Sequence, residues 1–92
     1  MAMIRGKSFR AMASDIAEGY AIVNPLFLKP LDNETLKNLF QEVIRFEAEI
    51  RAEKFPQQDS QAIRMRNMRL QRLHSTKSII KNFARERRIL II

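Results

Sequence analysis

The stretch from Ser60 to Arg88 contains neither glycine nor proline, the two residues that most often interrupt a helix. Its apolar residues recur at helical spacing, so the sequence predicts one helix of about 43 Å over residues 60–88. Asp59 or Ser60 can cap its first turn. A helix of this length needs neighbours along its whole extent, which limits the folds that the chain can adopt.

Two more helices are predicted upstream. One covers residues 33–55, between Asp32 as N-cap and Pro56, and its apolar residues form a single stripe opposite most of its charges. The other covers residues 7–20, where apolar side chains fall three or four positions apart. Gly19 near its end is suited to a helix C-cap.

Residues 21–32 connect these two helices. Pro25 and Pro30 are expected to prevent helix formation and to keep the chain extended. A solvated linker would be polar, whereas this segment is rich in large apolar side chains, so we expect an extended arm that packs across helices of its own chain or of a partner. Those side chains are Ile22, Val23, Leu26, Phe27, Leu28 and Leu31.

The predicted fold class is all-α, with residues 1–92 in a single helical domain. A helical hairpin carries an N-terminal helix and an extended, proline-containing arm, and oligomerisation completes it to a helical bundle. The helix over residues 33–55 spans roughly 33 Å and cannot cover the longer one, so the overhang needs the first helix, the arm or a second subunit. The terminal sequence ILII adds further apolar surface. We therefore expect a homo-oligomer, with a dimer favoured.

The net charge of +7 is unevenly distributed. Residues 1–60 carry eight Lys or Arg and nine acidic residues, whereas residues 61–92 carry nine Lys or Arg and one acidic residue. The concentration of positive charge in residues 61–92 favours an anionic partner, which can be DNA, RNA or an acidic protein. A membrane surface is a third hypothesis, although the apolar stripe of the basic helix is better explained as core.

Residues suited to catalysis are scarce. Without any cysteine the chain has no disulfide, thiolate zinc site or cysteine nucleophile, and its one histidine, His74, is predicted on the polar side of the basic helix. No metal-ligand motif and no glycine-rich phosphate loop occurs. We expect no enzymatic activity, no metal and no cofactor. No apolar run is long enough for a membrane span and no secretory signal is visible, so the expected location is the cytoplasm.

Three arginines of the basic helix, Arg66, Arg69 and Arg72, project towards its apolar side. Glu47 lies within the apolar stripe of the preceding helix. Because an unpaired buried charge is costly, we expect Glu47 to form a bidentate ion pair with Arg69 or Arg72. The remaining arginines would bury their stems and expose their guanidinium groups.

Six cations of the basic helix remain as candidates for nucleic-acid binding. Four are predicted on the exposed side, two lie near the edge of the apolar stripe, and amide and hydroxyl side chains are interspersed among them. The surface lacks aromatic residues for base stacking, so contacts to the phosphate backbone with low sequence specificity are expected. The alternative is a homo-oligomeric interaction module that docks an acidic protein. The six candidates are Arg64, Lys77, Lys81, Arg85, Arg87 and Arg88.

Overall fold

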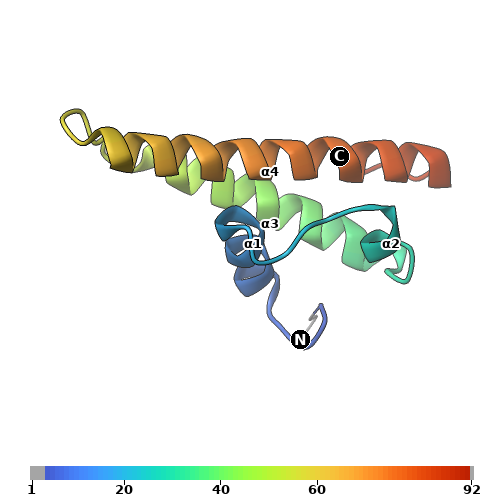
Figure 1. The fold of residues 1–92 in the computed structure, drawn as a ribbon. Helices are drawn as coiled ribbons and strands as arrows, with labels where there is room; N and C mark the ends of the chain where they lie inside the picture. Colours follow the sequence, from blue (N-terminus) through green and yellow to red (C-terminus); the bar gives the residue numbers. More distant parts are fainter. Residues whose placement is uncertain (1–3, 92) are drawn as a thin grey trace.

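The computed structural model of the chain describes residues 4–91, which form four helices and, within that range, no strand (Figure 1). The all-α fold class predicted from the sequence is thereby confirmed. The helices are α1 (Phe9–Glu18), α2 (Pro25–Leu28), α3 (Asn33–Ala52) and α4 (Ser60–Arg87). None of these helices combines the length and the apolar content that a membrane crossing requires.

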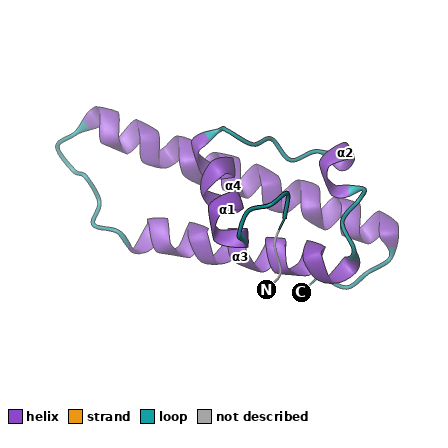
Figure 2. Cartoon of the chain, turned by 90° about the horizontal axis from the view of Figure 1, so that it is seen from below, coloured by secondary structure: helices purple, strands orange, loops and turns teal. Residues whose placement is uncertain are grey.

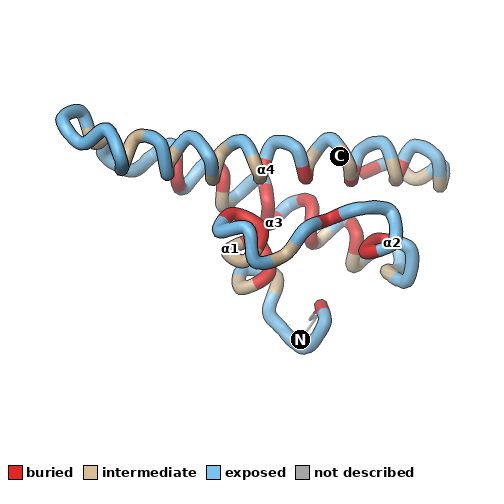
Figure 3. Tube along the Cα trace, in the orientation of Figure 1, coloured by how far each residue is buried: buried red, intermediate tan, exposed pale blue. Residues whose placement is uncertain are grey.

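Helices α3 and α4 form an antiparallel hairpin, and α1 lies across both of them on one side (Figures 1 and 2). Buried apolar residues of all three helices belong to one core cluster. Figure 3 shows that the buried residues of α4 lie on the side of the helix that faces α3 and α1. The opposite side of α4 is exposed along its length. The largest fully buried side chains include Ile16 of α1, Leu28 of α2, Leu36, Leu39, Val43 and Ile50 of α3, and Leu73 and Ile80 of α4.

The two long helices begin at the predicted caps. The backbone N–H of Thr35 donates to Asp32 Oδ1 at 2.7 Å, and that of Ala62 donates to Asp59 Oδ1 at 3.0 Å. Each bond satisfies a backbone N–H of the first helical turn that has no carbonyl partner within the helix. Helix α3 ends earlier than predicted, at Ala52, because the next residue already adopts an extended conformation with ψ of 148°.

The sequence predicted an extended arm over residues 21–32, but part of this arm forms helix α2. Pro25 occupies the first position of α2, where its missing N–H removes no hydrogen bond and its fixed φ suits a helix. Asn24 caps this turn by accepting a hydrogen bond from the Phe27 N–H at 2.9 Å. The expectation that proline would prevent a helix here was therefore wrong.

Only one side of the arm packs on the helices. Val23, Phe27 and Leu28 are buried, whereas Ile22 and Leu26, which we expected to pack as well, are 76% and 79% exposed. Because the buried side chains hold the arm in place, the exposed ones cannot turn inward without removing others from the core.

The overhang of α4 is covered by its own chain. Helix α2 packs against α4, and the residues after α4 fold back. Arg88 adopts a left-handed conformation with φ of 64°, and the Ile89 N–H then donates to Ala84 O at 3.0 Å, which closes a Schellman motif. Ile89 is half-buried and Ile91 is buried. The terminal apolar sequence is thus partly used within the chain; Ile92 lies outside the described residues.

Candidate functional site

Most cations of α4 fall into two sets; Arg66 belongs to neither, because it is half-buried and its guanidinium lies 5.3 Å from the centre of the Phe55 ring in the loop before α4. One set reaches across to other helices and to the arm, and the other lies on the exposed side of α4. Because the cations of both sets lie on one continuous helix, the position of each around the helix axis determines to which set it belongs. The first set fixes the fold, and the second is the candidate functional surface.

Glu47 is buried, as predicted, but its partner is not the one expected. Its Oε1 lies 2.6 Å from Lys77 Nζ, and its Oε2 lies 3.6 Å from Arg51 Nη2. Pairing with Arg69 or Arg72 was the wrong prediction, because these arginines point towards α1. Lys77 instead lies on the side of α4 that faces α3.

Arg72 and Arg69 hold the end of α1. Arg72 Nη1 donates to Ala17 O at 3.0 Å, and Arg69 Nε lies 4.0 Å from a carboxylate oxygen of Glu18. A cation at this position is favourable because the carbonyl end of a helix carries a partial negative charge. Gly19 ends α1 with φ of 84°, and a Cβ at this position would lie 3.1 Å from Arg72 Cζ.

Arg87 binds the connection between α2 and α3. Its Nη1 donates to Leu31 O at 2.7 Å, its Nη2 donates to Lys29 O at 3.1 Å, and its guanidinium lies 4.6 Å from the centre of the Phe83 ring. The structure therefore places two of the six candidate cations, Lys77 and Arg87, in contacts with other segments of the chain.

The remaining candidates are exposed. Lys81 and Arg85 are four residues apart, which places them on one side of α4, and Arg88, the left-handed cap of the helix, lines the same hollow as they do; we call these three the cationic strip. Arg85 Nη2 donates to Asn82 Oδ1 at 2.6 Å. Across residues 4–91 no carboxylate lies within ion-pair distance of the strip. Arg64 is also exposed, about 26 Å from Lys81 along the axis.

A shallow hollow of about 410 Å³ adjoins the cationic strip. The strip residues line one part of it, and the returning segment of Ile89, Leu90 and Ile91 lines another. Leu90 is 78% exposed. The hollow therefore combines positive charge with an apolar edge.

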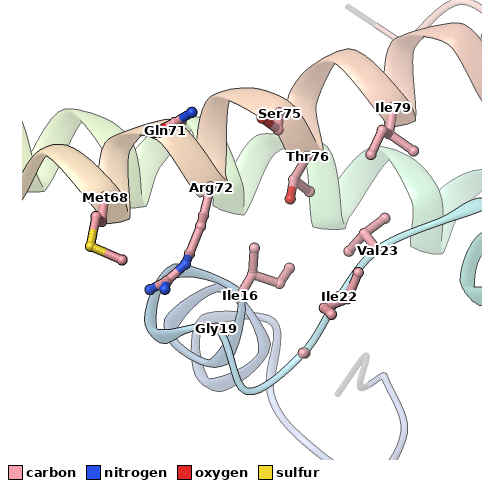
Figure 4. A pocket seen from close by; sticks show the side chains of 11 residues that line it. Ile16, Gly19, Ile22, Val23, Met68, Gln71, Arg72, Ser75, Thr76 and Ile79 are labelled. Atoms are coloured by element: carbon pink, nitrogen blue, oxygen red, sulfur yellow. The ribbon is translucent and has the colours of Figure 1, made fainter.

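A second hollow, which the sequence did not predict, lies on a different side of α4. This groove, of about 490 Å³, separates α4 from the segment that links α1 to α2 (Figure 4). Ile22 and Val23 form one wall, Met68 and Ile79 belong to the other, and the Thr76 hydroxyl points into the space between them. The signal in the sequence was Gly19, since a glycine C-cap turns the chain at this point.

Two carboxylates outside α4 have shifted pKa values. Arg10 of α1 donates from both terminal nitrogens to Glu49 of α3, at 2.8 and 2.7 Å. This hydrogen bonding lowers the pKa of Glu49 and raises that of Arg10. Hydrogen bonds from Thr35 lower the pKa of Asp32, the N-cap of α3. Both carboxylates stabilise the fold and lie outside the cationic strip.

Within the described part of the chain, no three His, Asp or Glu side chains come together as metal ligands would, and His74 is exposed on α4. No protein-family model, curated protein or solved structure matches the chain. Its function must therefore be argued from surface geometry and charge.

Proposed function

We propose that the chain is a small, non-enzymatic, cytoplasmic accessory protein that binds nucleic acid through its basic C-terminal helix with low sequence specificity. One observation carries the proposal. Lys81, Arg85 and Arg88 lie together on a 28-residue helix and its cap, exposed and without a carboxylate partner among residues 4–91.

Phosphates are the groups that such a surface fits best. Three cations on one rigid helix can each neutralise a phosphate, and the strip contains no aromatic ring on which a base could stack. Contacts of this kind position a protein on the backbone but do not distinguish sequences. Each neutralised phosphate of duplex DNA contributes about −0.9 to the slope of log K against log salt, so the strip accounts for a slope of about −3.

The test compares two variants with equal loss of charge. One replaces the strip (Lys81→Gln, Arg85→Gln, Arg88→Gln), and the matched control replaces three exposed lysines elsewhere (Lys29→Gln, Lys37→Gln, Lys54→Gln). Duplex DNA and RNA are titrated at several salt concentrations. We expect the strip variant to lose most of its affinity and to have a flatter salt slope by about three, with little change in the control.

Two outcomes would contradict this proposal. If the control loses as much affinity as the strip variant, net charge alone drives the binding. If the wild type binds neither DNA nor RNA at low salt, the nucleic-acid hypothesis is wrong.

A second candidate function is an interaction module that docks an acidic protein. The observation that favours it is the apolar edge of Ile89 and Leu90 beside the strip, because an acidic peptide with apolar residues could occupy both. Competition separates the two functions. An acidic peptide that binds while duplex DNA fails to displace it would favour this second function.

We also propose that the chain acts as a homo-oligomer, with a dimer favoured. Support comes from three large apolar side chains of the arm region that the chain leaves in water, Tyr20, Ile22 and Leu26. Several such side chains in one region usually mark an interaction site. A solution mass of about two chains, each of 10.8 kDa, is the expected result at micromolar concentration.

A further inference from the structure

We propose that a second copy of this chain docks on the face formed by the groove beside α4 and by the outer side of residues 20–26. We call this surface the arm face. The inference rests on the dimer proposed above and names the surface through which it forms.

The arm face leaves large apolar side chains in water. Tyr20, Ile22 and Leu26 are each at least 76% exposed, although all three are large and apolar. Ile22 also lines the groove, together with Met68 of α4, which is 42% exposed. Because Ile22 is both a protruding side chain and part of the groove lining, the two features adjoin one another, and several exposed apolar side chains in one region usually mark an interface.

The chain cannot bury the arm face itself. The residues that directly follow Ile22 and Leu26 in the chain, Val23 and Phe27, are inserted in the core at 3% and 4% exposure. Asn24 fixes the turn between them through its hydrogen bond to the Phe27 N–H. Rotating the arm to hide Ile22 would expose these core residues, so only another molecule can cover the arm face.

The arm face fits a protein surface better than it fits a small ligand. A small ligand in the groove would leave Tyr20 and Leu26 in water, because neither residue lines it. A protein surface with both a hollow and protruding apolar side chains would cover all of them. The arm face itself has both features, so two copies related by a two-fold axis can each insert side chains into the groove of the other.

Charge is compatible with this arrangement. A chain of net charge +7 would resist association if its cations met at the interface. At about 100° per residue, the cationic strip lies on the side of α4 roughly opposite Met68 and Ile79 of the groove. Arg72, which also lines the groove, is held on the Ala17 carbonyl. The dimer thus carries its two cationic strips outward, and both stay free for a partner.

The experiment measures solution mass by light scattering over a concentration series. Ile22→Asp with Leu26→Asp is the test variant, and Leu90→Asp is the control, because Leu90 is as exposed as these two residues but lies outside the arm face. We expect the wild type and the control to be dimers. Association of the test variant should weaken by about 100-fold or more, with unchanged helical circular dichroism, since uncompensated carboxylates are costly to bury.

Each contrary outcome has a distinct meaning. A wild type that remains one chain at high micromolar concentration overturns the dimer and this inference together. A dimer that survives in the test variant, or that dissociates equally in the control, overturns the arm face alone.

A second measurement applies if the test variant does not fold. The chain has no cysteine, so Ile22→Cys and Leu90→Cys each introduce a single thiol at an exposed position. A short bis-maleimide should cross-link two chains of the Ile22→Cys variant, and it should not cross-link two chains of the Leu90→Cys variant. The reverse pattern would overturn the inference.

Discussion

Lys77 Nζ of α4 lies 2.6 Å from Glu47 Oε1 of α3, so the two long helices are joined by an ion pair within their interface. Glu47 is 3% exposed, and its second oxygen has no hydrogen-bond partner in the described structure. Most of the electrostatic stabilisation of this carboxylate therefore depends on one lysine, since Arg51 is farther away and its side chain is 60% exposed.

Replacing Lys77 should destabilise the hairpin. We expect Lys77→Met to lower the free energy of unfolding by about 2–3 kcal/mol, because it leaves a buried carboxylate without its closest cation. Arg51→Met is the control and should have little effect. Urea denaturation measures both, and the double variant Glu47→Leu, Lys77→Met should recover most of the loss. Equal stability of Lys77→Met and wild type would mean that the pair is not formed.

Substitutions at Gly19 and Gly6 distinguish two causes of lost stability, which are backbone strain and displacement of the Arg72 side chain. Both glycines have positive φ, at 84° and 75°, but a Cβ at Gly6 would meet no atom within 4 Å. Gly6→Ala should cost about 1 kcal/mol from strain alone. Gly19→Ala should cost about 1–2 kcal/mol more, because the new Cβ displaces the guanidinium from Ala17 O.

A double-mutant cycle checks the cause. In an Arg72→Ala background, the costs of Gly19→Ala and Gly6→Ala should become similar, as measured by thermal unfolding. If the difference between the two glycines persists there, the contact with Arg72 is not its origin.

The apolar stripe of α4 should contribute unequally along its length. Leu73→Ala and Ile80→Ala should each lower the free energy of unfolding by about 2–5 kcal/mol, because both side chains are fully buried. Met65 also lies on α4 but is 49% exposed, so Met65→Ala should change stability far less. The three substitutions are compared in the Ile22→Asp, Leu26→Asp variant, so that dimer formation does not contribute. If all three lower the free energy of unfolding equally there, Leu73 and Ile80 are not packed more tightly than Met65.

Stability should decrease in acid through the bond between Arg10 and Glu49. The pKa of Glu49 lies below its ordinary value of 4.5, so the unfolded chain binds protons more readily than the folded chain. The contribution of the Arg10–Glu49 bond to stability is complete above pH 4.5 and is lost as the pH falls through the lowered pKa of Glu49. We expect Glu49→Gln to reduce the fall in melting temperature between about pH 5 and pH 3. Glu53→Gln, at an exposed glutamate, is the control, and an equal reduction there would exclude this cause.

Local patterns predicted the elements of this fold well. Asp32 and Asp59 cap the long helices because a short carboxylate reaches the backbone of its own first turn, a contact that needs no tertiary neighbour. The lack of glycine and proline between residues 60 and 88 likewise predicted α4 to within one residue. Pro25 misled the prediction because proline is excluded from helix interiors but suits a first turn, and only packing of the arm determines which applies.

The partners of the charges could not be predicted in this way. Helical periodicity indicates the direction in which a side chain projects, but it does not specify which residue of a neighbouring helix lies opposite. Glu47 was correctly placed in the interface, whereas the choice of Lys77 over Arg72 followed from the register of α3 against α4 and from the position of α1 across them. The same tertiary arrangement placed Arg87 against the arm and left Lys81, Arg85 and Arg88 exposed, because a charged side chain is held only where an acceptor lies within its reach.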